Sequence, residues 1–519
     1  MLCFCLKKLY PLVSFGYFDL ASYLSPTYNE LLVICASFRS IRRFIFCVQV
    51  MSETVFLSKT RSNCQLSACG LTLDIGRQRL TESDYQQLLD KARECDLLGR
   101  QIAMVKGEEV NGSEHRQALH TSLRSQDPAS PHYEEVRAVR EKMTSIARAV
   151  RSGEWKGATG KTITDVINIG IGGSEMGPHA VYHALREINP AIKLHFLSAV
   201  DGTLVDRILG VLNPETTLAV VSSKSFSTRE TMLNAELVNE WYAQAGIKTK
   251  EQRAQHIFVV SAKESACAEM NLPEENRFPM WSWVGGRFSV WGAIGLPLVI
   301  ALGPEVFDEF LHGAYEMDQH MVQKGLEDNL PATLALLSYW NSRKHQMVSH
   351  CLLPYDERLR LVVAWLQQLE MESLGKSEGA DGKVISDRTG QSVWGGFGNE
   401  AQHSFYQWLR DGSGRTSIDL VWCEEAGHKH AHHHLVLNAN AQAQAEALVT
   451  RQTPSDEFFN AVSTIQIKKL TPETLGAFMA MYEHKTTMLA TLYGLNAFDQ
   501  PAVEYGKKLC RELEAKLSE

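Results

Sequence analysis

Short apolar runs that end in glycine or hydroxyl residues alternate with helical segments from about residue 160 onward. The runs are ITDVINIGIGG, KLHFLSAVDGT, TLAVVSSKS and HIFVVSA, and segments such as GPHAVYHALREI separate them. Strands that alternate with helices form right-handed βαβ units, so the pattern predicts a parallel sheet. A second alternating region begins near residue 331, where the predicted strands are QMVSHCLLPY, SIDLVWCEE and HLVLNAN. The sequence therefore predicts two α/β domains.

Predominantly helical segments are predicted on both sides of this α/β region. Residues 51–150 contain two amphipathic runs, and the first of them starts at Thr81, a predicted N-cap. The last fifty residues are also predicted to be helical. The predicted divisions are an extension over residues 1–50, a helical region over 51–155, α/β domains over 156–325 and 326–465, and a helical segment over 466–519.

The first fifty residues differ in composition from the rest of the chain. They contain ten aromatic residues and four cysteines, and their net charge is +3, whereas the whole chain sums to −8. Met51 opens a polar stretch of ordinary composition, so we expect it to be the functional start and residues 1–50 to lie outside the fold. A targeting segment is the alternative, because Lys7 and Lys8 precede an apolar run, which Pro11 interrupts.

The overall composition is that of a globular protein. The chain of 519 residues is 44% apolar and 22% charged, which argues against disorder. A mildly acidic chain lacks the basic stripe of a nucleic-acid binder, and no run approaches the roughly 18 apolar residues of a membrane span. Eleven cysteines at irregular spacing favour a reducing cytosol over a disulfide framework. We expect a cytoplasmic protein with neither nucleic acid nor membrane as a partner.

The first predicted strand end carries a cluster of glycines. Ligands of open α/β sheets bind beyond the carboxyl ends of the strands. Gly170, Gly172 and Gly173 permit a tight turn and a close approach of the backbone to a ligand. A dinucleotide site, with Asp201 as its ribose-binding acid, is one alternative, but the spacing differs from G-x-G-x-x-G. The other alternative is that these glycines only permit a tight turn and bind no ligand.

A later strand end carries hydroxyl residues around a lysine, immediately before a predicted helix. Hydroxyl groups, a cation and the exposed amides of a helix start together suit a phosphate group. These residues are Ser222, Ser223, Lys224, Ser225, Ser227 and Thr228. A serine-rich helix cap is the alternative, although a cap needs only one hydroxyl group.

Three further residues have side chains suited to chemistry. Arg287 follows two glycines in an apolar stretch and needs an anionic partner, either a structural carboxylate or a substrate. Glu372 ends an apolar helix, where it is a candidate general base or an ordinary solvated carboxylate. His403 precedes an apolar-aromatic helix and, taken alone, favours a core or capping role over catalysis.

Five histidines between His428 and His434 suggest transition-metal binding. On the strand predicted for part of this segment, alternate side chains point to opposite faces, and no cysteine or carboxylate completes a site. We therefore predict that these histidines form no metal site.

Taken together, the motifs resemble those of the glucose-6-phosphate isomerase family. They occur in the family's order over most of the chain after Met51, and they are NIGIGGS, VDGT, SSKSFSTRET, WVGGRFSVWGAIG, MES, AQHSFYQ, MYEHK and NAFDQPAVEYGK. The resemblance implies an α/β fold of two doubly wound sugar-isomerase domains with parallel sheets and flanking helices, working as a homodimer. It also implies interconversion of D-glucose 6-phosphate and D-fructose 6-phosphate in glycolysis and gluconeogenesis, with no cofactor and no metal.

The resemblance also assigns roles to individual residues. Glu372 matches the base that moves a proton between carbon 1 and carbon 2, and Arg287 matches the arginine beside the developing enediolate. His403 matches the ring-opening acid/base, which in the family reaches into the neighbouring subunit, and Lys507 matches a further group at the site. The matched substrate-binding positions are Gly173, Ser174, Ser223, Lys224, Ser225, Phe226, Ser227, Thr228, Gln368 and Gln500.

The chain departs from the family's common pattern at several positions, but no departure removes a catalytic functional group. These positions are Ser225, Ser227, Ser282, Leu369, Glu370 and Ala401. Three other functions are alternatives: a non-catalytic sugar-phosphate sensor, another aldose–ketose isomerase, such as one for mannose or amino-sugar phosphates, and a dinucleotide enzyme. The presence of Glu372 and His403 disfavours the sensor, and the glycine spacing disfavours the dinucleotide enzyme.

Overall fold

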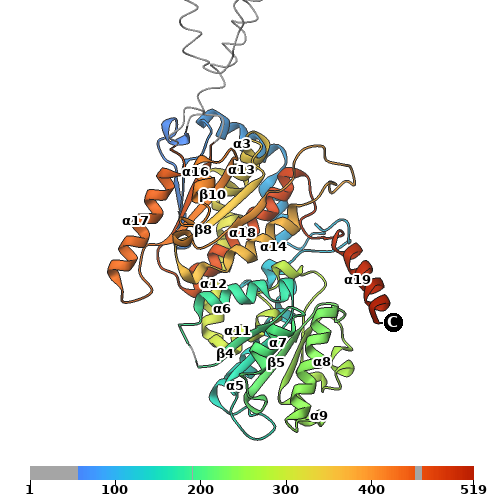
Figure 1. Cartoon of the computed structure of the whole chain (residues 1–519). Coiled ribbons are helices and arrows are strands. Elements are labelled where there is room, and N and C mark those ends of the chain that lie inside the picture. The colour runs from blue at the N-terminus through green and yellow to red at the C-terminus, as the bar shows by residue number, and fades with distance from the viewer. Residues whose placement is uncertain (1–55, 190, 451–458, 519) are drawn as a thin grey trace, which may run out of the picture. The chain divides into compact units, whose positions relative to one another are not determined.

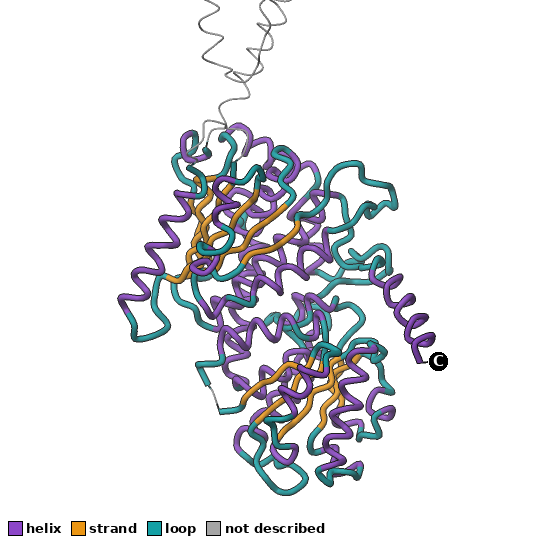
Figure 2. The backbone as a smooth tube through the Cα atoms, in the orientation of Figure 1, coloured by secondary structure: helices purple, strands orange, loops and turns teal. Residues whose placement is uncertain are grey.

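Two β-sheets organise residues 56–189, 191–450 and 459–518, which are the residues that this computed structural model describes (Figure 1). The extension predicted over residues 1–50 lies outside the described residues. The strands form two groups, with helices between and around them (Figure 2). In the described ranges no helix combines the length and the apolar character that crossing a lipid bilayer requires.

The first sheet is parallel, with the strand order β4-β3-β5-β6-β7. Its strands are β3 (Asp165–Ile169), β4 (Lys193–Leu197), β5 (Thr217–Ser222), β6 (Ile257–Ser261) and β7 (Arg277–Pro279). Neighbouring residues of a strand belong to different core clusters, as Val166 and Ile167 do. Both faces of the sheet are therefore covered, as in a doubly wound sheet. The predicted parallel α/β sheet is confirmed, and the short strand β7 adds to it.

Helices connect these strands and cover the sheet. Those inside the first α/β region are α6 (Met176–Leu185), α7 (Gly202–Leu209), α8 (Arg229–Gln244), α9 (Lys250–Ala254), α10 (Ala266–Glu269) and α11 (Leu296–Leu302). The preceding helices are α3 (Glu82–Glu94), α4 (Leu97–Val105) and α5 (Tyr133–Ser152). Thr81 begins α3 with a capping box, as predicted, because its hydroxyl accepts from Asp84 N–H while the Asp84 side chain accepts from Thr81 N–H.

The second sheet is mixed, with the order β1-β2-β11-β10-β8-β9. Its strands are β1 (Gln65–Ala68), β2 (Leu71–Arg77), β8 (Ser349–Pro354), β9 (Ser392–Gly395), β10 (Thr416–Cys423) and β11 (Ala461–Ile467). β8, β9, β10 and β11 are parallel, whereas β2 pairs antiparallel with β11 and β1 pairs antiparallel with β2. The region predicted to be helical over residues 51–155 thus supplies a two-stranded edge to this sheet.

One predicted strand is wrong. The run HLVLNAN lies inside a helix, α17 (Ala431–Ala447). This helix buries Ala441 and Ala445, which lie one turn apart, while Leu435 and Val436 are exposed. The alternating apolar residues resembled a strand, but the alanine- and glutamine-rich continuation has strong helix propensity. The face-alternation argument made for the nearby histidines therefore does not apply.

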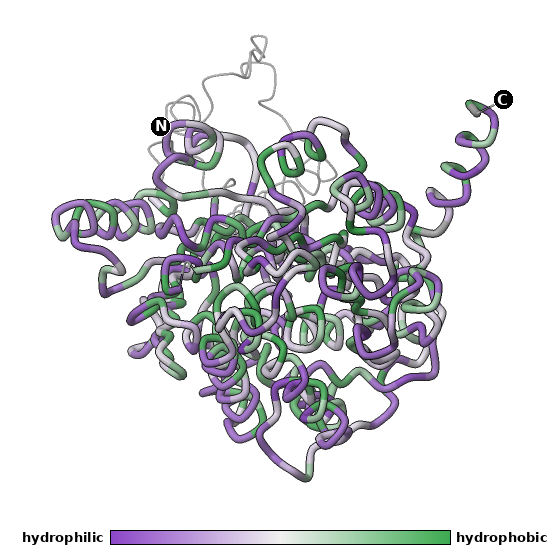
Figure 3. The backbone as a smooth tube through the Cα atoms, turned by 90° about the horizontal axis from the view of Figure 1, so that it is seen from below, coloured by the Kyte–Doolittle hydropathy of each residue, from purple (hydrophilic) through white to green (hydrophobic). Residues whose placement is uncertain are grey.

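Four long helices pack together, because one of them contacts each of the other three. These are α12 (Pro304–Gln323), α13 (Leu330–Arg343), α14 (Val362–Leu374) and α18 (Pro472–Tyr493), and the remaining helices are α15 (Gly398–Ala401), α16 (Tyr406–Asp411) and α19 (Val503–Ser518). α14 packs against both α6 and α18. One hydrophobic core includes Val220 of the first sheet and Leu352 of the second. Figure 3 shows hydrophobic stretches concentrated in the interior of the molecule, while the helix at the C-terminal end, α19, projects from the body.

Candidate active site

The glycine turn after β3 lies against the segment that carries Arg287. Gly172 has φ +61° and begins the 3₁₀ turn Gly172–Ser174, which leads into α6. A Cβ atom on Gly173 would lie only 2.1 Å from the carbonyl carbon of Gly286. The close backbone approach that requires glycine at position 173 is therefore an approach to another loop of the same chain.

The hydroxyl loop after β5 presents its side chains at the start of α8. Ser225 and Ser227 are exposed, and their hydroxyl oxygens lie 2.8 Å apart. Phe226 anchors the loop because it is buried and has φ +50°. Thr228 is the N-cap residue of α8, but its side chain makes no capping hydrogen bond. The alternative prediction of an ordinary hydroxyl cap is therefore wrong for Thr228.

Lys224 connects this loop to the Arg287 segment. Its Nζ donates to the carbonyl oxygens of Ser282, at 2.9 Å, and Val284, at 2.8 Å. Burial, with nearby Arg116 as the second cause, lowers the pKa of Lys224 to about 8. A cavity of about 80 Å³ is lined by Lys224 together with Gly286 and Gln500. Lys224 of the predicted phosphate loop and the predicted contact Gln500 therefore line the same cavity.

Arg287 and Glu372 are brought together although they are far apart in the sequence. Arg287 Nη1 lies 3.4 Å from Glu372 Oε1, and the side chains are 1% and 25% exposed. Arg287 also donates from Nε to Ser373 Oγ at 2.7 Å and from Nη1 to Gln500 Oε1 at 2.9 Å. Burial lowers the pKa of Arg287, and the Glu372 carboxylate opposes that shift. The anionic partner that the sequence required is thus a carboxylate of this chain.

The Gln368 amide lies at the glycine turn, one helical turn before Glu372 on α14. Its Nε2 atom would be 3.2 Å from a Cβ atom placed on Gly172. α14 therefore presents Gln368 and Glu372 toward the first sheet and its loops. The predicted residues Gly173, Gln368, Glu372, Arg287 and Gln500 form one cluster.

Residues that the sequence prediction missed hold the segment that contains Gln500. Arg287 Nη2 donates to the carbonyl oxygen of Ala497. Lys376 Nζ lies 2.7 Å from Asp499 Oδ1. Burial raises the pKa of Asp499, but its hydrogen bonds to Lys376 and Ser113 prevail, so that pKa is lowered. Asp499 lies inside the motif NAFDQPAVEYGK and Lys376 follows the motif MES, but only their pairing in space reveals the role.

His403 and Lys507 lie on exposed parts of the chain. His403 follows α15, and within the described residues its imidazole makes no hydrogen bond to the other predicted site residues. Lys507 is exposed on α19, which Figure 1 shows as a separate rod beside the body. The Arg229 Nη2 atom, at the start of α8, lies 2.6 Å from Glu514 Oε1 of α19. The described chain thus ties α19 to the helix that follows the hydroxyl loop.

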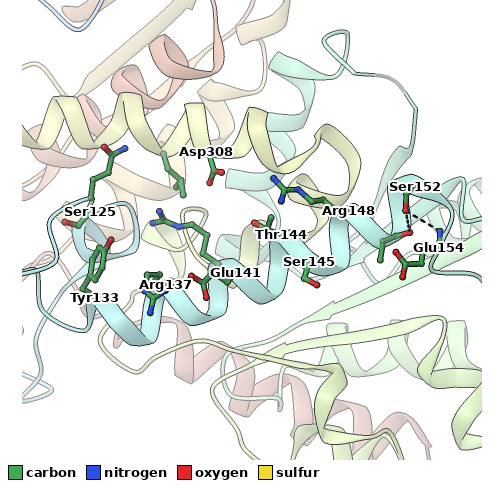
Figure 4. Close-up of a pocket in the computed structure, with 14 residues that line it drawn as sticks. Ser125, Tyr133, Arg137, Glu141, Thr144, Ser145, Arg148, Ser152, Glu154 and Asp308 are labelled. Carbon is green, nitrogen blue, oxygen red and sulfur yellow. Dashed lines mark hydrogen bonds and ion pairs between the residues drawn. The ribbon is translucent and has the colours of Figure 1, made fainter.

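A separate pocket of about 1000 Å³ runs along α5 (Figure 4). Arg137, Arg148 and Asp308 are among its lining residues, and no predicted site residue lines it. Arg137 already pairs with two glutamates of its own helix, Glu134 and Glu141. This pocket therefore lies apart from the cluster around Glu372.

Known proteins of one family resemble this chain over most of its length. The sequence profile of the family described as phosphoglucose isomerase matches residues 74–519. The chain belongs to the phosphoglucose isomerase family. A glucose-6-phosphate isomerase of Paraburkholderia phymatum is 42% identical over 472 residues, which are 87% of each chain, and one of Burkholderia ambifaria is 42% identical over 468 residues, which are 86% of each chain.

Solved structures agree with this membership of the phosphoglucose isomerase family. The crystal structure of a glucose-6-phosphate isomerase from Chlamydia trachomatis aligns with a TM-score of 0.79 and 29% identity, covering 89% of this chain and 91% of that one. A hypothetical protein from Thermus thermophilus aligns with a TM-score of 0.66 and 28% identity, covering 86% of this chain and 100% of that one. The α/β fold with two sheets described above is therefore the fold of the phosphoglucose isomerase family.

Proposed function

We propose that this chain is an aldose–ketose isomerase that interconverts D-glucose 6-phosphate and D-fructose 6-phosphate in glycolysis and gluconeogenesis. Membership of the phosphoglucose isomerase family supports this activity. The observation that carries the mechanism is the Arg287–Glu372 contact of 3.4 Å, because it places a fixed cation beside a partly accessible carboxylate. The cytoplasmic location expected from the cysteine content stays a prediction.

In the proposed reaction, Glu372 is the base. Its carboxylate takes the proton from carbon 2 of the open-chain aldose, and the electron pair of that C–H bond forms the C1–C2 double bond of an enediolate. The guanidinium of Arg287 stabilises the negative charge that develops on the oxygen, since it is already oriented and requires no reorganisation. Glu372 then returns the proton to carbon 1, while the hydroxyl proton moves from the oxygen on carbon 2 to the oxygen on carbon 1. The product is the ketose.

The hydroxyl loop is proposed to hold the substrate's phosphate group. Ser223, Ser225, Ser227 and Thr228 lie at the start of the 16-residue helix α8, where amide groups and the helix dipole favour an anion. Binding at a distance from the reacting carbons fixes their position relative to Glu372, so that binding energy orients the substrate. Gly173, Ser174, Gln368 and Gln500 would contact the sugar.

His403 is proposed to open the sugar ring in the site of the partner subunit of a homodimer. Its exposure on this chain supports that role, because a second copy can reach it. Large apolar side chains nearby are also exposed, including Trp408 of α16, 47%, and Leu435 of α17, 66%. Exposed apolar residues of this size suit burial in a two-fold interface. Lys507 on α19 is proposed to act at the same site.

Replacement of Glu372 by glutamine tests the proposed function. The amide keeps the size of the side chain but is not a base, so turnover should fall by about 10² to 10⁴ while fructose 6-phosphate still binds. Exchange of the carbon 2 hydrogen with deuterated water should also disappear. A wild-type protein that does not convert fructose 6-phosphate would contradict the function, and normal exchange in the variant would contradict the role of Glu372.

A further inference from the structure

Four consecutive polar residues are buried in the middle of α18. Tyr482, Glu483, His484 and Lys485 are each 1% exposed or less. Buried polar groups require hydrogen-bonding partners, and buried charges require opposite charges. Because successive side chains point in different directions around a helix, these four residues belong to two separate networks on different sides of α18.

The first, which we call the α14 network, consists of His350, Glu370, Asp419, Tyr482 and Lys485. Lys485 Nζ donates to Glu370 Oε1 at 2.7 Å, and His350 Nδ1 lies 3.4 Å from Glu370 Oε2. His350 Nε2 lies 2.9 Å from Asp419 Oδ2, to which Tyr482 also donates at 2.8 Å. The network therefore joins strands β8 and β10 and helix α18 to a single residue of α14.

The charges of the α14 network balance when His350 is protonated. Burial and Lys485 lower the pKa of His350, but Asp419 and Glu370 prevail and raise it. Burial alone would raise the pKa of Glu370, but Lys485 and His350 hold it below its usual range. Two cations then face two carboxylates inside the core. Such an arrangement fixes geometry, because any displacement leaves a buried charge without its partner.

Glu370 lies two residues before Glu372 on α14. At 3.6 residues per turn, side chains two positions apart point about 160° away from each other around the helix axis. Glu370 therefore points into the core at Lys485, whereas Glu372 points to the other side at Arg287. Ser373 on the same turn accepts from Arg287 Nε at 2.7 Å. The last turn of α14 is held between two cations, Lys485 on its inner side and Arg287 on its outer side.

We propose that Glu370 and Lys485 are positioning residues that fix the turn of α14 carrying Glu372, so that its carboxylate keeps its place beside Arg287. This inference rests on the proposed isomerase function. Neither residue touches the substrate. A displacement of about 1 Å at the reacting group can lower the rate by 10²-fold. The hydroxyl loop belongs to the other sheet, so phosphate binding should not depend on this turn of α14.

The second network provides a matched control. Glu483 accepts from Trp291 Nε1 at 2.8 Å and pairs with Arg124, which also holds Asp318 through two hydrogen bonds of 2.8 and 2.7 Å. His484 Nε2 also contacts Asp318 Oδ1 at 2.6 Å, so this network likewise includes two residues of α18 and is as deeply buried as the first. Within the described residues, no hydrogen bond of Glu483, Arg124 or Asp318 involves α14. The change Glu483→Gln leaves Arg124 and Asp318 as a balanced pair.

The test compares the double variant E370Q/K485M with E483Q and the wild type. The double variant removes one positive and one negative charge, so His350 and Asp419 remain balanced and the core should fold. We expect its kcat for fructose 6-phosphate to fall at least tenfold. The KM and the competitive inhibition constant of inorganic phosphate should stay within about twofold. E483Q should unfold at lower temperature but keep its kcat within twofold.

A folded double variant with kcat within twofold of the wild type would overturn the inference, as would an equal loss of kcat in E483Q. If the double variant is insoluble, Glu370→Gln alone serves, because it keeps the side-chain shape and removes only the negative charge that faces Lys485 and His350. We expect it to lose at least threefold in kcat with an unchanged phosphate constant, and an unchanged kcat overturns the inference. An inactive wild type would instead contradict the proposed function, so the two failures are distinguishable.

Discussion

Arg287 Nη1 lies 3.4 Å from Glu372 Oε1, while its Nε and Nη2 atoms bind two further groups, one of them from a distant segment. Nε donates to Ser373 on α14, and Nη2 donates to the carbonyl oxygen of Ala497. A guanidinium group can make these bonds simultaneously because its donors form a rigid planar fork. The cation beside Glu372 is therefore fixed before any substrate arrives, as transition-state stabilisation requires.

Replacing Arg287 by lysine should lower kcat by about 10² to 10³, because an ammonium group cannot keep the contacts to Glu372, Ser373 and Gln500 together. Steady-state assays with fructose 6-phosphate measure the change. The exposed Arg207 offers the control Arg207→Lys, which should retain full activity. Wild-type turnover in Arg287→Lys would mean that a positive charge suffices without the guanidinium geometry.

Replacing Gly173 by alanine should separate the glycine turn from the Arg287 segment. The new Cβ atom would lie 2.1 Å from the Gly286 carbonyl group, so one of the two loops must move. A shift of that size near the reacting groups is expected to cost about 10² in kcat/KM. Gly112→Ala is the matched control, because nothing lies within 4 Å of its added methyl group. Equal activity of the two variants would show that the loops tolerate separation.

Hybrid dimers test whether His403 serves the partner's site. Glu372→Gln and His403→Ala homodimers should each be nearly inactive. When the two variants are denatured and refolded together, half of the dimers are hybrids, and each hybrid contains one intact site. Roughly a quarter of full activity should then return. No recovery, with hybrid dimers confirmed by mass, would mean that His403 acts in its own chain's site or in none.

Acid should destabilise the fold partly through His320. Its Nε2 accepts a hydrogen bond from Leu330 N–H at 3.1 Å, and burial lowers its pKa to about 4. The unfolded chain takes up this proton near pH 6.5, so the stability contributed by neutral His320 is present above that pH and is lost as the pH falls toward 4.

The variant His320→Gln isolates this contribution, because its amide oxygen can accept the same bond at any pH. Between pH 7 and pH 5 the wild type should lose about 2 kcal/mol more unfolding free energy than the variant. Urea unfolding at the two pH values measures the difference. Parallel losses in both proteins would show that His320 does not titrate in this window.

Local chemistry explains what the sequence predicted well. Thr81 caps a helix because its hydroxyl group accepts a hydrogen bond from a free amide group at the helix start, and Asp84, three residues later, completes the capping box. β3 and β5 are continuous apolar runs, as strands buried on both faces must be. In these cases the residues that decide the structure lie within a few positions of one another.

The predictions that failed or were missing depend on contacts between distant segments. β1 alternates exposed and half-buried residues and is a strand because it pairs with β2 at a sheet edge. The pairing of Lys376 with Asp499 joins positions more than a hundred residues apart, and no local pattern indicates it. The sequence around Arg287 likewise allows either a substrate or a structural carboxylate as its partner, and in the structure the Glu372 carboxylate lies 3.4 Å away.

The antiparallel pairing of β2 with β11 has a consequence for the nascent chain. Gln78, just after β2, donates to the hydroxyl oxygen of Ser463 in β11, a residue 385 positions later. At about 5 to 20 residues per second, a ribosome needs roughly 20 to 80 s to reach that partner. During this interval β2 is not paired with β11, and the unpaired backbone groups of an exposed strand edge can associate with other chains. Slower translation of the residues between β2 and β11 would lengthen the time during which β2 has no partner strand. A chaperone that covers residues 65–77 would reduce association with other chains during that time.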